Sequence, residues 1–307
     1  MKGQHVLSVS EVSETDIHTI FKYADQLSRM KPSEYCEVLR DKTLACIFYE
    51  PSTRTSSSFI AAMTKLGGGV IPITQGVQFS SVSKGETLED TILTLAQYAD
   101  TIVLRHPETG SVRKAASVSP VPVINAGDGI GEHPTQALLD LYTIQREFGR
   151  LDNLHVAFVG DIAYGRTVHS LLKVLPRYAG VRVTLISPQA LRLGHPTSPQ
   201  LICEEAFVTS GLHEVRDILS DADVVYMTRV QKERFLSVES YEAVKDSCLL
   251  TPEIVGNLKP TARIMHPLPR VNELPTSIDA DPRAAYFRQV KNGLWVRMAL
   301  LTTILGK

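Results

Sequence analysis

The chain has 307 residues, and its 32 Lys and Arg residues against 33 Asp and Glu residues give a net charge of -1 at neutral pH. This length accommodates about two domains of ordinary size, and the lack of a basic surplus argues against a nucleic-acid partner. No apolar run reaches the roughly 20 residues that cross a bilayer, and the start of the chain lacks the apolar stretch of a signal peptide. We therefore expect a cytoplasmic protein that binds neither membranes nor nucleic acids.

The first part of the chain alternates between helical and strand patterns. Apolar residues at helical spacing predict a helix over 13–30, and a second helical pattern covers 87–98. Short apolar runs predict strands at 44–48, 70–73, 101–104 and 121–124. This alternation is typical of βαβ units with a parallel sheet.

A second alternating series follows a predicted helix over 134–148, where Pro134 suits the first helical position and Gly149 the end. The last segment, 284–305, is helical and apolar, and we expect it to pack on the first domain. The predicted fold class is α/β, with two doubly wound parallel-sheet domains: 1–142 plus 284–307, and 143–283. Further strands are predicted at 154–159, 181–186, 223–227 and 263–266.

The four cysteines, Cys36, Cys46, Cys203 and Cys248, form no metal-ligand or disulfide pattern. We therefore expect neither a zinc site nor a disulfide scaffold.

Ligands of parallel α/β sheets bind beyond the carboxyl ends of the strands, so polar residues that follow strands are the candidates. Ser52, Thr53, Arg54 and Thr55 follow the first strand and open a helix. A helix N-terminus with three hydroxyls and a guanidinium fits a phosphate dianion. The alternative is an ordinary N-cap followed by a solvated arginine.

Three further segments of the first domain are candidates. Ser80 and Lys84 lie in a polar loop that could equally be plain surface. Arg105 ends a strand, either aimed into the crevice or simply terminating the strand. His133 stands at a helix start, where the positive dipole favours a neutral imidazole, and Gln136 lies in the first turn. The alternative for this last segment is a cap followed by a solvent-facing amide.

The second domain offers the turn from Gly160 to Thr167, whose two glycines have the spacing of a P-loop, although Arg166 replaces the P-loop lysine. A nucleotide-binding phosphotransferase is therefore a competing hypothesis. Arg166 and Arg229, each near a strand end, would together suit a substrate with two carboxylates.

Together these segments resemble the aspartate carbamoyltransferase family, within the wider group that includes ornithine carbamoyltransferase, over nearly the whole chain. The residues that follow Thr55, Ser56 to Ser58, resemble the corresponding domain of the eukaryotic multifunctional pyrimidine-synthesis protein, so the chain could be one domain of a longer polypeptide. The motifs are Ser52-Thr53-Arg54-Thr55, Arg105-His106-Pro107, His133-Pro134-Thr135-Gln136, Gly165-Arg166-Thr167-Val168-His169-Ser170, Arg229-Val230-Gln231-Lys232-Glu233-Arg234 and His266-Pro267-Leu268-Pro269.

The resemblance implies transfer of the carbamoyl group from carbamoyl phosphate to the amine of L-aspartate in pyrimidine biosynthesis, without a cofactor. It also implies a homotrimer that shares its sites between subunits, and domain closure assisted by Glu50. The implied phosphate-binding residues are Ser52, Thr53, Arg54 and Thr55, with Arg105, and with Ser80 and Lys84 of a neighbouring subunit. The implied carbonyl-polarising residues are Thr55, Arg105 and His133, and the implied aspartate-binding residues are Arg166, Arg229, Gln231, Gln136 and Leu268.

Two other functions within this group stay open at this point. The first is carbamoylation of ornithine or another acceptor, although the His266-Pro267-Leu268-Pro269 motif favours aspartate. The second is a catalytically inactive relative that binds metabolites, although every expected active-site position is filled.

Overall fold

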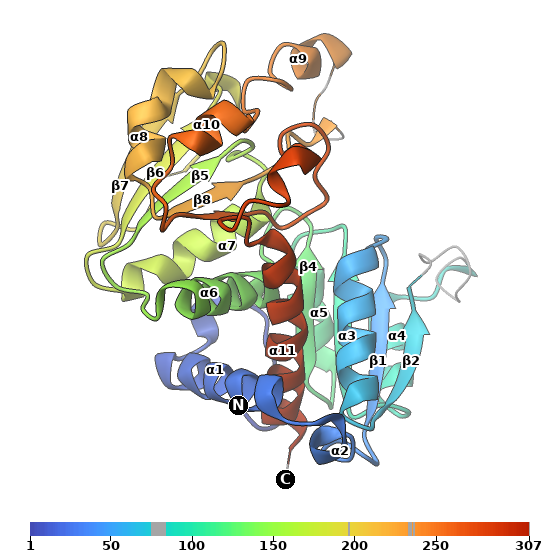
Figure 1. The fold of residues 1–307 in the computed structure, drawn as a ribbon. Coiled ribbons are helices and arrows are strands. Elements are labelled where there is room, and N and C mark those ends of the chain that lie inside the picture. Colours follow the sequence, from blue (N-terminus) through green and yellow to red (C-terminus); the bar gives the residue numbers. More distant parts are fainter. Residues whose placement is uncertain (75–83, 196, 233–234, 236, 307) are drawn as a thin grey trace. The chain divides into compact units, whose positions relative to one another are not determined.

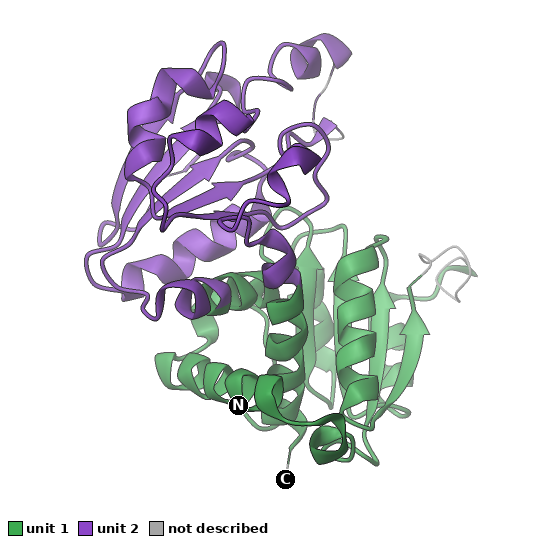
Figure 2. Cartoon of the chain, viewed as in Figure 1, with its two compact units in different colours: residues 1–142, 291–307 green, residues 143–290 purple. Residues whose placement is uncertain are grey.

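The computed structural model describes residues 1–74, 84–195, 197–232, 235 and 237–306. The chain forms two compact units, Met1–Tyr142 with Lys291–Lys307, and Thr143–Val290 (Figure 2). Both boundaries fall inside helices, α6 (Pro134–Phe148) and α11 (Tyr286–Leu305). Residues 284–290, which we expected in the first domain, group with the second unit, because the backbone of Ala285 donates to the carbonyl of Ile264 at 2.8 Å.

The first unit is built on a four-stranded sheet of order β2-β1-β3-β4, in which every neighbouring pair is parallel (Figure 1). Its helix starts follow the sequence, since the side chains of Ser13 and Thr87 accept hydrogen bonds from the first turns of α1 and α4. The elements are α1 (Glu14–Arg29), α2 (Pro32–Tyr35), β1 (Thr43–Phe48), α3 (Thr53–Lys65), β2 (Gly69–Ile73), α4 (Leu88–Leu95), β3 (Thr101–His106), α5 (Ser111–Val118) and β4 (Val123–Asp128).

Strand alternation divides the core of this unit between the two faces of the sheet. Ala45 and Ile47 of β1 pack in one cluster with Ile92 of α4 and Val112 of α5. The intervening residues of β1, including Phe48, point to the opposite face, because successive strand side chains alternate. Both faces of the sheet are therefore buried at β1, as is usual for parallel sheets.

The second unit holds a five-stranded parallel sheet of order β7-β6-β5-β8-β9. We predicted neither β7 nor α5, because β7 is an exposed edge strand and α5 is only 8 residues long. Strand β4 begins at Val123 and runs beyond the predicted end into the turn-rich Asn125–Asp128. The elements are β5 (His155–Val159), α7 (Arg166–Val174), β6 (Arg182–Ser187), β7 (Ile202–Phe207), α8 (Arg216–Asp221), β8 (Val224–Met227), α9 (Val238–Glu242), α10 (Pro252–Gly256) and β9 (Arg263–Met265).

Each sheet has one place where the strand order reverses. In the first sheet the chain leaves β1 toward β2 and returns to the other side of β1 as β3. In the second it leaves β5 toward β6 and β7, then returns beside β5 as β8. Crevices open beyond the carboxyl ends of such strand pairs, so β1 with β3 and β5 with β8 mark the expected ligand-binding edges.

The described part of the chain contains no helix long and apolar enough to cross a membrane.

Gly160, directly after β5, fixes how closely β5 and β8 approach at their carboxyl ends. Its φ is +117°, and a Cβ there would lie 2.3 Å from the carbonyl oxygen of Thr228. Only glycine combines this backbone conformation with this contact.

We expect Gly160→Ala to lower the free energy of unfolding by about 2–4 kcal/mol, because it adds both backbone strain and a clash. Gly256→Ala is the matched control, since Gly256 ends helix α10 and a Cβ there meets nothing within 4 Å. Urea unfolding of both variants measures the difference. Equal stability of the two variants would contradict the role assigned to Gly160.

Candidate functional site

The N-terminus of α3 is the first candidate site, and it lies directly after the carboxyl end of β1. Ser52 occupies the N-cap position, but its side chain makes no capping hydrogen bond. The first backbone N–H groups of a helix have no partner within the helix. With Ser52 not acting as a side-chain cap, the ordinary-cap alternative loses its main support, and the segment suits an anion better.

Thr55 and His133 come together beside this helix end. The Thr55 side chain is buried, and its Oγ1 lies 3.4 Å from Nε2 of His133. His133 is itself buried at the start of α6, where its carbonyl accepts from the backbone of Gln136 at 2.9 Å. The two residues that the sequence predicted to polarise one carbonyl group therefore adjoin in the first unit.

Arg105 is the last residue but one of β3, the strand beside β1, and lies at the same sheet edge. Its Nε donates to Oε2 of Glu50 at 3.2 Å, and its side chain is only 15% exposed. Burial lowers the pKa of the Arg105 guanidinium, while the charge and hydrogen bond of Glu50 raise it. A largely buried guanidinium next to a helix N-terminus favours the binding of a dianion.

Gln136 is held within α6 rather than facing solvent. Its Nε2 donates to Oδ1 of the buried Asp140 at 2.9 Å. The alternative of a solvent-facing amide is therefore wrong.

In the second unit, Asp161 organises the carboxyl ends of β5 and β8. Its fully buried carboxylate accepts from the backbone of Tyr164 at 2.9 Å and from Nε2 of Gln231 at 3.2 Å, and its backbone donates to Thr228 Oγ1 at 2.9 Å. Burial raises the pKa of Asp161, whereas these hydrogen bonds and the nearby charge of Arg229 lower it. We did not predict Asp161, although an acidic residue beside a glycine at a strand end was a usable signal.

The same carboxylate places two predicted substrate-binding residues. Gln231 binds it directly, and the charge of Arg229 acts on it. Arg166 opens helix α7 on the same turn as Tyr164, whose carbonyl accepts from the Arg166 backbone at 2.9 Å. Arg166, Arg229 and Gln231 therefore all lie at the carboxyl edge of the second sheet.

Leu268 follows β9 with an unusual backbone conformation, a φ of +57°. Its N–H donates to Nδ1 of the buried His266 at 2.7 Å, and Nε2 of His266 lies 2.8 Å from Glu273. Burial raises the pKa of Glu273, but the hydrogen bond and charge of His266 outweigh it and leave that pKa lowered. A left-handed leucine costs about 1–2 kcal/mol, so the segment is held rigidly by His266.

Ser80 lies outside the described residues. Lys84 is described, and it is exposed at the start of the segment that leads into α4.

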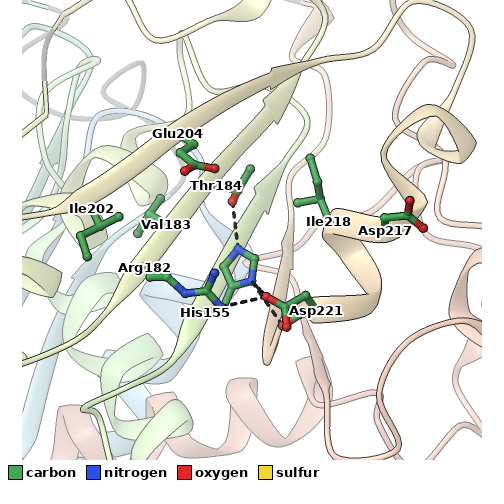
Figure 3. Close-up of a pocket in the computed structure, with 9 residues that line it drawn as sticks. All are labelled: His155, Arg182, Val183, Thr184, Ile202, Glu204, Asp217, Ile218 and Asp221. Atoms are coloured by element: carbon green, nitrogen blue, oxygen red, sulfur yellow. Dashed lines mark hydrogen bonds and ion pairs between the residues drawn. The ribbon is translucent and has the colours of Figure 1, made fainter.

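A pocket of about 320 Å³ lies at the opposite edge of the second sheet (Figure 3). His155, Arg182 and Ile202, the first residues of β5, β6 and β7, line it. Figure 3 shows His155 between Thr184 and Asp221, with Nε2 2.9 Å from Thr184 Oγ1 and Nδ1 3.2 Å from the Asp221 carboxylate. Arg182 also donates to Asp221, at 2.8 Å. These groups satisfy one another at the amino ends of the strands, so the pocket is not the candidate site.

No group of three or more His, Cys, Asp or Glu side chains within the described ranges could hold a metal ion.

Two α/β units with parallel sheets, each with charged and polar side chains at the carboxyl edge of its sheet, define a two-domain α/β enzyme. Family models match both halves: residues 4–146 match the carbamoyl-P binding domain of aspartate/ornithine carbamoyltransferase, and residues 152–304 match its Asp/Orn binding domain. The chain belongs to the aspartate/ornithine carbamoyltransferase family. The turn from Gly160 to Thr167 lies inside the second match, which removes the ground for the P-loop hypothesis.

The chain is similar to proteins of different lengths. It is 46% identical to the multifunctional protein pyr1-3 of Dictyostelium discoideum over 100% of this chain but 14% of that protein. It is 45% identical to the aspartate carbamoyltransferase catalytic subunit of Alkaliphilus oremlandii, over 100% of this chain and 92% of that subunit. The chain thus spans only about a seventh of the multifunctional relative.

Among solved structures, the chain is similar to aspartate transcarbamoylase from Trypanosoma cruzi in complex with carbamoyl phosphate and aspartate. The identity is 40%, the TM-score is 0.91, and the match covers 99% of this chain and 98% of the other. At this identity and coverage the likeness includes the fold of both units.

The anion seat at α3 makes a direct prediction. We expect Arg54→Ala to weaken the binding of inorganic phosphate about tenfold or more, because a hydrogen bond to a charged group contributes about 1.5–3 kcal/mol. Calorimetric titration with phosphate measures the change. Arg182→Ala is the control, because it removes a guanidinium from the amino edge of the second sheet; an equal loss in both variants would contradict the assignment.

Proposed function

We propose that this protein transfers the carbamoyl group of carbamoyl phosphate to the amine of L-aspartate, giving N-carbamoyl-L-aspartate and phosphate, as a step of pyrimidine biosynthesis. The observation that carries the proposal is the convergence of an anion seat, Ser52 to Thr55, with the buried Thr55 and His133 pair. The family membership and the similarity to a structure with both substrates support it.

Carbamoyl phosphate binds first in this proposal. Its phosphate accepts hydrogen bonds from the first turn of α3 and from the side chains of Ser52, Thr53, Arg54 and Thr55. The carbonyl oxygen accepts from Thr55, Arg105 and His133, which stabilise the negative charge that develops there during attack. Each preorganised donor of this kind contributes about 3–4 kcal/mol to the transition state.

L-Aspartate binds the residues of the second unit. Arg166 and Arg229 match its two carboxylates as bidentate partners, and Gln231 adds an amide whose position Asp161 fixes. Gln136 and the carbonyl of Leu268 take positions near the amine. Orienting both substrates for attack removes about 7–11 kcal/mol of entropic cost, so the amine attacks without a nucleophilic side chain.

The assembly of this enzyme is also a proposal. We infer a homotrimer in which Ser80 and Lys84 reach the phosphate of a neighbouring subunit's site, supported by the exposure of Lys84. On domain closure Glu50 exchanges its contact with Arg105 for arginines of the second domain. A cytoplasmic location stays a prediction. Origin within a longer multifunctional polypeptide also stays a prediction. The identity to the multifunctional protein pyr1-3, 46%, nearly equals the 45% identity to the separate catalytic subunit.

The acceptor specificity is tested by turnover. With carbamoyl phosphate as donor, we expect carbamoylation of L-aspartate and no turnover of L-ornithine, because two guanidiniums suit two carboxylates whereas ornithine carries one carboxylate and a second amine. Colorimetric detection of the ureido product measures both. Turnover of ornithine without turnover of aspartate would reassign the acceptor.

The shared site is tested by subunit mixing. Arg54→Ala and Lys84→Ala trimers should each be nearly inactive, and mixing them under subunit exchange should restore part of the activity, because a hybrid trimer contains one site with both residues intact. Activity before and after exchange is compared, with native mass spectrometry to demonstrate hybrids. Hybrids without recovered activity would rule out sharing through these two residues.

A further inference from the structure

Two residues of opposite charge, Arg297 and Asp140, are buried in the first unit. Arg297 of α11 is 4% exposed, and Asp140 of α6 is completely buried. Burial lowers the pKa of Arg297 to about 10, and the charge of Asp140 acts against that shift. Burying two charges is costly and does not by itself stabilise a fold, so the pair calls for another role.

The two residues are connected to α3 and α6, the helices whose first turns carry candidate site residues. The Arg297 guanidinium stacks on the ring of Phe59, 5.1 Å from its centroid, and Phe59 is one turn after Thr55 in α3. Asp140 is likewise one turn after Gln136 in α6. Helices α3 and α11 of the first unit lie side by side (Figure 1), so the Arg297 guanidinium contacts α3 and also feels the charge of Asp140 in α6.

A glycine in helix α11 leaves room for the Arg297 guanidinium. Gly293 stands one turn before Arg297, and a Cβ at Gly293 would lie 2.9 Å from Nη1 of Arg297 and 3.0 Å from Leu139. Nη1 donates weakly to the Gly293 carbonyl at 3.4 Å, and Nε is buried with no hydrogen-bond partner. Glycine is unfavourable within a helix, so helix propensity does not explain its presence at this position.

Asp140 has a specific chemical effect on Gln136. An ionised carboxylate only accepts hydrogen bonds, so it selects the Nε2 side of the Gln136 amide, which donates to Asp140 Oδ1 at 2.9 Å. The amide oxygen Oε1 then remains as an acceptor for another donor. An amide at position 140 would not make this selection, because it has both a donor and an acceptor and could pair with either side of the Gln136 amide.

We propose that Asp140, with Arg297 as its counter-charge, is a positioning residue that fixes the Gln136 carboxamide so that its oxygen accepts an N–H of the substrates. This inference rests on the proposed function, which places the amine of aspartate beside Gln136. Asp140 touches no substrate, and it acts only through Gln136.

The test is a double-mutant cycle between Asp140→Asn and Gln136→Ala, read as kcat/KM for aspartate at saturating carbamoyl phosphate. In Asp140→Asn, the side chain at position 140 loses one acceptor oxygen and gains an N–H group, so it no longer selects the Nε2 side of the Gln136 amide. We expect Asp140→Asn to lower kcat/KM about tenfold in the otherwise native enzyme, the effect of one lost charge-assisted hydrogen bond, and less than about twofold in Gln136→Ala.

The outcomes separate the inference from the proposed function. Equal losses in the two backgrounds would mean that Asp140 acts structurally, and this would overturn the inference while leaving the enzyme's activity established. A native enzyme that does not carbamoylate aspartate would overturn the proposed function, and the inference with it. Thermal unfolding of each variant checks that the fold is retained.

A second background keeps the test decisive if Asp140→Asn fails to fold because Arg297 is left unpaired. Arg297→Met with Asp140→Asn removes both charges together, and such replacements of buried ion pairs preserve folding in other proteins. Adding Gln136→Ala to this pair should change kcat/KM by less than about twofold, because the oriented amide is already lost. A further fall of tenfold or more would show that Gln136 is oriented without Asp140 and would overturn the inference.

Discussion

The reversal of strand order in each sheet is the constraint on which the rest of the structure depends. Because β3 returns beside β1, and β8 beside β5, the carboxyl ends of these strand pairs open into space that no crossover connection covers. Glu50 follows one strand of the first pair and Arg105 is the last residue but one of the other, so their contact spans the reversal. Asp161 and Thr228 occupy the equivalent positions of the second sheet. Each unit thereby gathers side chains from distant parts of the chain at one edge.

The two units stabilise the polar groups at these sheet edges in different ways. In the second unit a single buried carboxylate, Asp161, satisfies the turn at Tyr164 and the side chain of Gln231, and Gly160 allows β8 to approach. In the first unit Asp140 of α6 accepts a hydrogen bond from Gln136, and the charge of Arg297 of α11 lies nearby. Both arrangements hold candidate site residues in place through hydrogen bonds to neighbouring residues, and the proposed carbamoyl transfer requires such preorganisation.

Much of this organisation could be predicted from the sequence. The motif residues Ser52 to Thr55, Arg105 and His133 were found because they follow apolar runs and begin helices, and the helices with good caps, α1 and α4, start where their Ser and Thr residues indicate. Strand β7 was missed because all of its residues are exposed or half-buried at a sheet edge, which leaves little apolar signal. Asp161 and Asp140 were missed as supporting residues. Asp161 stands at a strand end, which was a usable signal, but its partner Gln231 is 70 positions away, and nothing in the local sequence of Asp140 indicates burial.

The sequence by itself determined the class of fold, the family and the candidate site residues, because periodicity, caps and motif spacing are local properties of the chain. Only the tertiary structure decided which of these residues meet. Thr55 and His133 are 78 positions apart, and Phe59 and Arg297 are further apart still, yet each pair is in contact. Such contacts depend on the order in which strands join a sheet and on how helices pack across it. The serine that opens α3 was recognisable from sequence as a cap or an anion ligand, and the fold favoured the ligand by leaving its side chain without a capping hydrogen bond.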